Sequence, residues 1–136
     1  MLKEYKIQSK YNKVVAVCDE INLFMVENRI CKSTADSFEI CLIEALNNII
    51  KHAYKQDFTK EIKIIIKIEE EIVSVSLIDN GLPRKNTEKA KLEYDPDDIE
   101  NLPEGGMGLY IIENLMDHTK YESTPEFNKY TISKEL

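Results

Sequence analysis

Three groups of residues in this sequence have the types and the spacing to carry chemistry. The first is the polar set Glu44, Asn48 and His52, spaced four residues apart in a segment with helical periodicity. Such residues lie on one ridge of a helix, about 5–6 Å from one another. A carboxylate can serve as a general base, and an amide oxygen is a suitable ligand for Mg²⁺. The simpler alternative is the exposed polar edge of an amphipathic helix.

The second group, Asp79-Asn80-Gly81, follows an alternating run that predicts a strand. An Asn-Gly pair is typical of a hairpin turn, but that turn needs a partner strand directly after it, and a long polar segment follows here. A buried carboxylate at a strand end can accept a hydrogen bond from an exocyclic amine, while a glycine lets the backbone pass close to a ring. Asp79 and Gly81 are therefore candidate contacts to a heterocyclic base.

The third group is the glycine-rich stretch Gly105-Gly106-Met107-Gly108-Leu109, which opens directly into a helical pattern. Backbone amides in such a turn, together with the positive end of the helix dipole, can hold a phosphate group. The stretch is not a P-loop, because the Lys-Ser/Thr pair is missing, and it lacks the preceding strand of a dinucleotide-binding fingerprint. A flexible hinge ahead of the helix is the alternative.

Hydrophobic periodicity predicts the elements that must position these groups. Amphipathic helices are expected over residues 11–31 and from the N-cap candidates at 33–36 to about residue 55, followed later by a short helix over 109–116. Strands are expected at residues 3–9, 61–68, 73–78, 118–123 and 128–134. This order predicts an α/β fold, an α+β two-layer sandwich with helices on one face of a mixed, mostly antiparallel sheet.

Residues 82–104 break every pattern, because charged side chains of both signs alternate there with three prolines. A structureless loop of this length is uncommon inside a compact domain unless it has a function.

Composition limits the function further. The 136 residues are expected to form a single domain, residues 1–136, and the net charge of -7 argues against binding to nucleic-acid backbones. No apolar run reaches the roughly 18 residues of a membrane span, and the charged start lacks a secretion signal. Cys18, Cys31 and Cys41 show no metal-binding spacing, so we expect reduced thiols in a cytoplasmic protein.

Taken together and in this order, the three groups resemble the nucleotide-binding boxes of the GHKL ATPase superfamily, which is built on the Bergerat fold. Within it they are similar to the anti-sigma factor serine/threonine kinases, and the resemblance covers nearly the whole chain. The matching motifs are Glu44-x-x-x-Asn48-x-x-x-His52-Ala53, Asp79-x-Gly81 and Gly106-x-Gly108-Leu109.

The resemblance implies a role for each group in binding ATP and Mg²⁺. Glu44 would be the base, or orient the attacking hydroxyl, and Asn48 would coordinate Mg²⁺. Asp79 would accept a hydrogen bond from the adenine amine, with Gly81 giving room for the ring. Residues of about 82–106 would form an ATP lid. The other cofactor-binding positions would be His52, Gly105, Gly106, Met107, Gly108 and Leu109.

The same resemblance implies an ATP-dependent serine/threonine protein kinase that regulates transcription without touching DNA. Its partners would be a sigma factor and a small antagonist protein, which the kinase phosphorylates, and the kinase would form a homodimer. The sequence leaves two alternatives open. One is a non-catalytic ATP-binding module that regulates another signalling protein, and the other is a pseudo-enzyme that binds no nucleotide.

Two positions depart from the pattern of the resembled kinases. Glu104 stands where some of them carry a basic residue just before the lid glycines. Arg84, Lys85 and Lys89 are then the remaining basic candidates for a γ-phosphate contact. In the last strand, Phe127-Asn128-Lys129 occupies the stretch where they usually have a Gly-x-Thr pattern near the adenine.

Overall fold

The computed structural model describes residues 1–84 and 106–136, and its elements follow the expected order. These elements are β1 (Leu2–Gln8), α1 (Tyr11–Glu27), α2 (Lys32–Asn48), η1 (Ile49–Ala53), β2 (Glu61–Ile68), β3 (Ile72–Asp79), α4 (Gly106–Leu115), β4 (His118–Ser123) and β5 (Asn128–Glu135). The α/β prediction is confirmed. The expected loop over 82–104 falls outside the described residues beyond Arg84.

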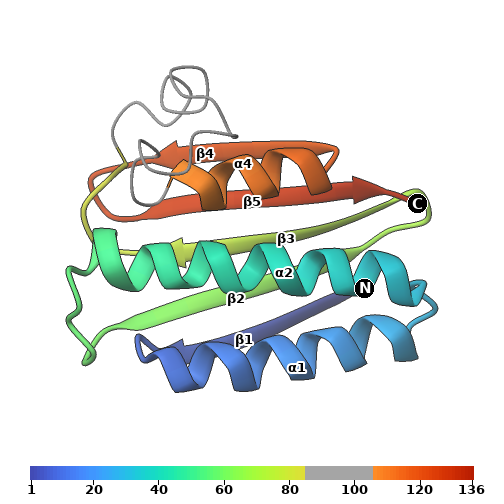
Figure 1. The fold of residues 1–136 in the computed structure, drawn as a ribbon, viewed down its shortest axis with the longest axis horizontal. Coiled ribbons are helices and arrows are strands. Elements are labelled where there is room, and N and C mark those ends of the chain that lie inside the picture. The colour runs from blue at the N-terminus through green and yellow to red at the C-terminus, as the bar shows by residue number, and fades with distance from the viewer. Residues whose placement is uncertain (85–105) are drawn as a thin grey trace.

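The five described strands form one sheet in the order β1-β2-β3-β5-β4 (Figure 1). All four strand pairings within the described residues are antiparallel, which agrees with the expected mostly antiparallel sheet and leaves no parallel pair among these strands. The two helices between β1 and β2 explain the first pairing. They form a helical hairpin, so the chain reverses direction three times before β2 reaches β1.

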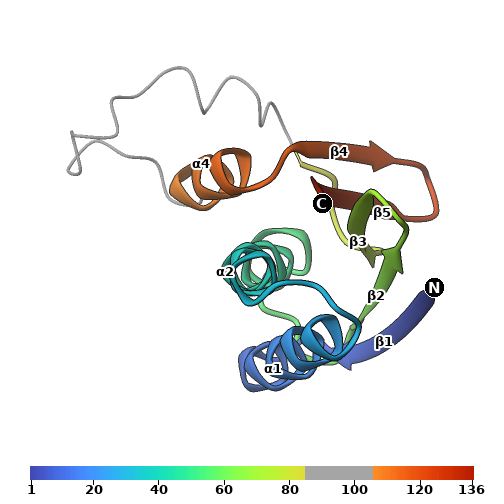
Figure 2. The same ribbon diagram turned by 90° about the vertical axis from the view of Figure 1, so that its right-hand side faces the viewer.

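The three α-helices pack on one face of the sheet (Figure 2). Strand β2 shows why, because Ile62, Ile64 and Ile66 alternate toward the helices and are fully buried. Helix α2 lies over the middle of the sheet and buries Phe38 and Leu42 completely. Burying a side chain of this size contributes about 1.5–3 kcal/mol, so this layer is the main source of stability.

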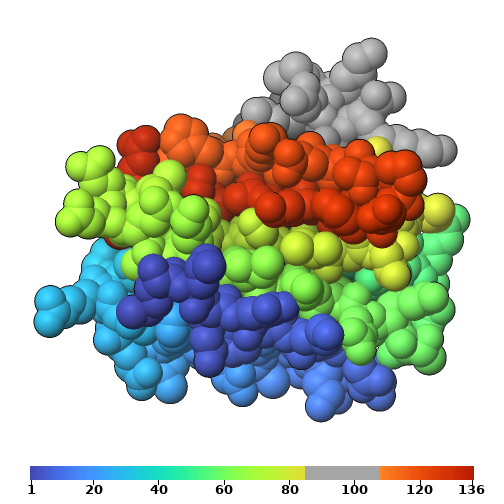
Figure 3. Space-filling view, turned by 180° about the vertical axis from the view of Figure 1, so that it is seen from behind, coloured from blue at the N-terminus to red at the C-terminus, as the bar shows by residue number. Residues whose placement is uncertain are grey.

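The other face of the sheet carries no helix among the described residues (Figure 3). It holds exposed ion pairs instead, such as Lys63 with Glu4 and Lys120 with Glu122, each at 3.3 Å. Exposed pairs of this kind contribute about 0–1 kcal/mol each, so they keep the face hydrated more than they stabilise the fold. Within residues 1–84 and 106–136, every helix is too short or too polar to cross a membrane.

The three cysteines are free thiols with different surroundings. Burial raises the pKa of Cys18 to about 12 and that of Cys41 to about 11. Cys31 is exposed, and hydrogen bonds with the hydroxyls of Ser33 and Thr34 lower its pKa to about 7.

Native protein at pH 8 is therefore expected to react rapidly with iodoacetamide at one thiol per chain, because only the thiolate is nucleophilic. Counting modified thiols by mass spectrometry checks this expectation, and Cys31→Ser should remove the fast phase. Equal labelling rates for all three cysteines in folded protein would contradict it.

Candidate functional site

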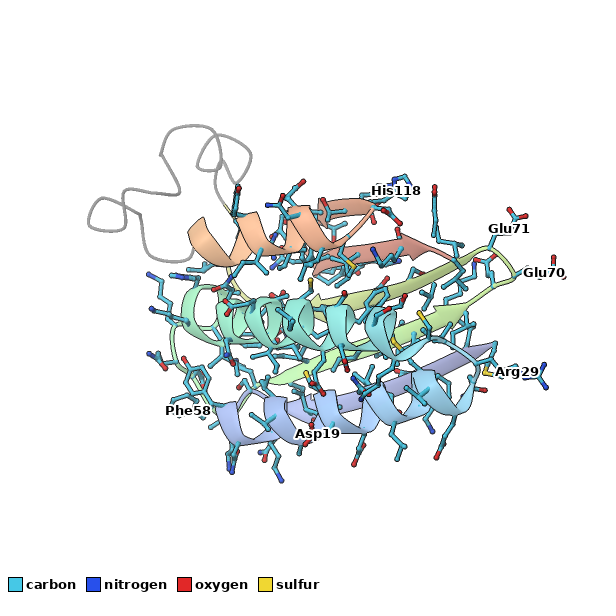
Figure 4. The ribbon with its side chains drawn as sticks, turned by 45° about the vertical axis from the view of Figure 1, so that its right-hand side comes forward. Asp19, Arg29, Phe58, Glu70, Glu71 and His118 are labelled. Atoms are coloured by element: carbon cyan, nitrogen blue, oxygen red, sulfur yellow. The ribbon has the colours of Figure 1, made fainter. Side chains whose placement is uncertain are left out.

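The three predicted groups lie at the same end of the molecule. The C-terminal end of α2, the C-terminal end of β3 and the N-terminal end of α4 all reach the left side of Figure 1. Glu70 and Glu71, in the turn between β2 and β3, mark the opposite end (Figure 4). His118 lies toward that opposite end too, where it contacts Glu135 at 3.1 Å, so it is remote from the candidate site.

Helix α2 and the first turn of α4 meet at Gly108. A Cβ atom added at Gly108 would lie 2.8 Å from Glu44 Oε2 and 3.3 Å from Asn48 Nδ2. Glu44 and Asn48 are both partly buried, while Gly108 is buried. The first and the third predicted groups, which are far apart in the sequence, therefore share one site.

The N-terminal end of α4 gives this site its electrostatic character. Because α4 begins at Gly106, the N–H groups of its first turn have no partner within the helix and favour an anion. A phosphate bound there would lie beside the Glu44 carboxylate, and the two negative charges would repel each other. A cation between them would remove this repulsion, and the Asn48 amide oxygen is a suitable ligand for it.

A π-helix follows Asn48 and connects α2 to the second group. The N–H of Tyr54 donates to the Ile49 carbonyl at 2.9 Å, five residues back, which widens the last turn. Turns of this type are rare and frequently lie at functional sites. The wide turn ends the regular four-residue ridge that the sequence predicted, and His52 is exposed on η1.

Gly81 passes directly over the end of this π-helix. A Cβ atom at Gly81 would lie 2.4 Å from the Ala53 carbonyl oxygen and 2.9 Å from Ala53 Cβ. The next residue, Leu82, donates its N–H to the same carbonyl at 2.9 Å. The backbone contact excludes every side chain at this position, so the glycine is required by close approach to η1.

Asp79 ends β3 as a buried carboxylate, with 6% of its surface exposed. Its Oδ1 accepts hydrogen bonds at 2.9 Å from the Gly81 N–H and from Nδ2 of Asn128. Burial raises the pKa of Asp79, while these two donors and the Arg84 charge act in the opposite direction. A carboxylate held in this way can receive a further hydrogen-bond donor from a ligand.

Tyr54 fixes the strand end that carries Asp79, and the sequence did not indicate it. Its hydroxyl accepts the Asn80 N–H at 3.1 Å and donates to the Glu61 carbonyl. The side chain is buried, and burial raises its pKa. One residue thus connects the end of η1 to the start of β2 and the end of β3.

Tyr54→Phe is expected to lower the free energy of unfolding by about 1–3 kcal/mol, because it leaves buried polar groups without a partner. Urea denaturation measures this loss. The matched control is Tyr11→Phe, since the Tyr11 hydroxyl makes only an exposed hydrogen bond to Gln56 at 2.8 Å. We expect a change within about 0.5 kcal/mol for the control. Equal effects of the two substitutions would contradict the role given to Tyr54.

Arg84 marks the described start of the predicted lid, and two tyrosines hold it. Its guanidinium carbon lies 4.0 Å from the ring centroid of Tyr130 and 4.9 Å from that of Tyr121. Its backbone N–H also donates to the Tyr121 hydroxyl at 2.9 Å. These contacts attach the residue to β4 and β5. The other basic candidates, Lys85 and Lys89, lie outside the described residues, as do Glu104 and Gly105.

A family model described as a histidine kinase-like ATPase domain matches residues 7–134. The chain belongs to this family. Two similar relatives are the serine-protein kinase RsbW of Bacillus mycoides strain KBAB4 and that of Bacillus cereus strain B4264. The first is 35% identical over 120 residues and the second 35% over 119, and in both cases the match covers 84% of this chain and 72% of the relative.

Solved structures show the same fold at low identity. The RsbU and RsbW domains of Rv1364c from Mycobacterium tuberculosis superpose with a TM-score of 0.72 at 15% identity, over 100% of this chain and 32% of that longer chain. The SiaB–SiaC complex from Pseudomonas aeruginosa gives a TM-score of 0.62 at 13% identity, over 98% of this chain and 89% of that one. The histidine kinase-like ATPase fold is thus conserved across these proteins.

Proposed function

We propose that this histidine kinase-like ATPase domain is a cytoplasmic, ATP-dependent serine/threonine protein kinase that acts as an anti-sigma regulatory factor. It holds a sigma factor and phosphorylates a small antagonist protein. The observation that carries the proposal is the meeting of Glu44 and Asn48 with the N-terminal turn of α4 at Gly108. The identity with the RsbW serine-protein kinases over most of the chain supports the same reaction.

In this proposal, each part of ATP is bound by a different part of the site. Asp79 and Gly81 receive the adenine, and the N–H groups at the start of α4 receive the phosphates. Glu44 accepts the proton of the attacking serine or threonine hydroxyl. The hydroxyl oxygen then bonds to the γ-phosphorus as the bond to the β–γ bridging oxygen breaks, and ADP leaves. Phosphoryl transfer asks a protein mainly for positioning and charge stabilisation, which this site supplies.

The site fits a magnesium ion that is shared with the nucleotide. Among residues 1–84 and 106–136, no three acidic, histidine or cysteine side chains gather into a metal site. Asn48, which lies beside the start of α4, would hold the ion with help from phosphate oxygens and water, which is the usual way proteins bind Mg²⁺. When bound, the ion neutralises the phosphate charge beside Glu44.

A homodimer belongs to the same proposal, and the free edge of β1 supports it. Strand β1 lies at one end of the described sheet order, with an unpaired outer edge there. If two copies paired antiparallel about Tyr5, Glu4 of each copy would face Lys6 of the other, which favours the pairing. Sedimentation equilibrium tests this proposal, and a monomer at every concentration would contradict it.

The kinase proposal is tested with purified protein, Mg-ATP labelled at the γ-phosphate, and the small antagonist encoded by a neighbouring gene. We expect label on a serine or threonine of the antagonist. Calorimetry with ATP and ADP is run in parallel. Tight ATP binding without transfer would favour a non-catalytic ATP-binding module, and the absence of both would favour a pseudo-enzyme.

A further inference from the structure

Asn128, the first residue of β5, is a buried polar residue that contacts Asp79 and Gly81 of the second group directly. Only 3% of its surface is exposed. Its Nδ2 donates to Asp79 Oδ1 at 2.9 Å and to the Gly81 carbonyl at 3.0 Å, with a longer contact to the Leu82 carbonyl at 3.4 Å. Its Oδ1 accepts the Ser123 hydroxyl at 2.7 Å. Both ends of the amide therefore have partners.

These partners determine the orientation of the amide. The sheet register places Asn128 directly opposite Asp79 on β3 and opposite Ser123 on β4. The carboxylate can only accept when ionised, so it requires the NH₂ end, and the Ser123 hydroxyl can donate to the oxygen end. A flipped amide would place two acceptors against each other on the Asp79 side. Asn128 can thus be satisfied in one orientation only.

The consequence for Asp79 is that its two oxygens are no longer equivalent. Oδ1 accepts both the Asn128 amide and the Gly81 N–H. Among the residues that the structure describes, none donates a hydrogen bond to Oδ2. Turning the carboxylate would break these two hydrogen bonds, one buried and one partly buried, so Oδ2 is the oxygen left to receive a donor from a ligand.

We propose that Asn128 is the positioning residue that makes the site select adenine, because it holds Asp79 with Oδ2 as an acceptor for an exocyclic amine. Adenine carries such an amine. Hypoxanthine and guanine carry a carbonyl oxygen at the same ring position, which would face the carboxylate as a second acceptor. A site that offers a buried acceptor rejects a base without a matching donor, because the acceptor of the protein then stays unpaired. This inference rests on the proposed function, in which the ligand is ATP.

The charge state of Asp79 supports the same role. Burial raises its pKa, and the Asn128 amide, the Gly81 N–H and the Arg84 charge lower it. The phenol of Tyr54, on the η1 side, is the other titratable group that faces it. A protonated Asp79 could donate to a carbonyl and would accept hypoxanthine, so the donors that keep it ionised also keep the site selective.

The test compares the dissociation constants of Mg-ATP and Mg-inosine triphosphate by calorimetry. The two bases differ only in the group at ring position 6, an amine in adenine and a carbonyl in hypoxanthine, and in the proton that hypoxanthine carries on the neighbouring N1. Wild-type protein is expected to bind ATP roughly 10- to 100-fold more tightly than inosine triphosphate. In Asn128→Ala the ratio should fall to about threefold or less, because only the Gly81 N–H then holds Asp79 in its orientation. Asn128→Thr, which keeps one donor, should restore an intermediate ratio. The matched control is Asn114→Ala, whose amide makes an exposed hydrogen bond to the Tyr110 carbonyl.

If Asn128→Ala weakens the binding of both nucleotides equally, Asn128 has a structural role only and the inference is overturned. If Asn128→Ala does not fold, Ser123→Ala is the second variant, because it removes only the hydroxyl that donates a hydrogen bond to Asn128 Oδ1. An unchanged ratio of the two dissociation constants in Ser123→Ala would overturn the inference as well. Wild-type protein that binds neither nucleotide would contradict the proposed function itself, and the inference would fail with it.

Discussion

Replacing Glu44 by glutamine is expected to slow phosphate transfer to a protein serine by about 10²–10⁴-fold, which is the usual contribution of a general base. Glutamine keeps the shape of the side chain beside Gly108 but cannot accept the proton of the hydroxyl. The affinity for Mg-ATP should change by no more than about threefold, because the lost step occurs in the transition state. The initial rate of acid-stable phosphate transfer measures the first effect, and calorimetry measures the second.

Glu39→Gln on the same helix is the matched control. Burial and the neighbouring charges of Asp19 and Asp36 raise the pKa of Glu39, and the residue is one helical turn or more from Glu44. Its neighbour Asp19 lies near the middle of α1 (Figure 4). We expect normal transfer from this variant. Wild-type rates in Glu44→Gln would remove the base from the proposed mechanism.

Gly108→Ala is expected to reduce transfer by about 10²-fold in a protein that folds as well as wild type. The new Cβ would lie 2.8 Å from Glu44 Oε2, so the carboxylate must move away from its position. A displacement of about 1 Å in a catalytic group can cost 10²-fold in rate. Stability should not fall, because alanine favours a helix over glycine by about 1 kcal/mol and the displaced atom ends a flexible side chain.

Gly81→Ala provides the contrasting case. Its Cβ would meet the Ala53 carbonyl oxygen at 2.4 Å, which is a backbone atom that no rotamer change can move. This variant should lose about 1–3 kcal/mol of stability and bind ATP poorly. Thermal unfolding and transfer rates, measured together, separate the two glycines. Loss of stability in Gly108→Ala, or full transfer activity in that variant, would contradict the geometry described for the site.

The sequence was sufficient to predict the element order and most of the elements, because the periodicity was strong. In β2, for example, isoleucine fills every second position from Ile62 to Ile68, and the predicted strand over 61–68 is the observed Glu61–Ile68. The end of the second helix was less accurate. A helix to about residue 55 was expected, but α2 ends at Asn48 and a π-helix follows. No local pattern distinguishes the two, since the end of the π-helix contacts residues that follow β3, namely Asn80 and Leu82.

The sequence predicted the site residues that belong to motifs. It did not predict the residues whose role depends on contacts between strands. Glu44, Asn48 and Gly108 were identified from spacing and resemblance, and the structure brings them together. Asn128 was noted only as a departure, because its meaning depends on the register that pairs it with Asp79. Tyr54 gave no signal at all, since its partners lie at the start of β2 and directly after β3.

A crystal structure with Mg²⁺ and a non-hydrolysable ATP analogue would show whether α2, the end of β3 and the start of α4 form one Mg-ATP site. We expect Mg²⁺ about 2.0–2.1 Å from the Asn48 amide oxygen, with the adenine amine on Asp79 Oδ2. A hollow of about 430 Å³ is lined by Lys6, Lys63 and Phe127, and it also reaches Asp79 and Asn80 at the end of β3. A nucleotide bound in that hollow, with Asn48 free of metal, would contradict the proposal of one shared site.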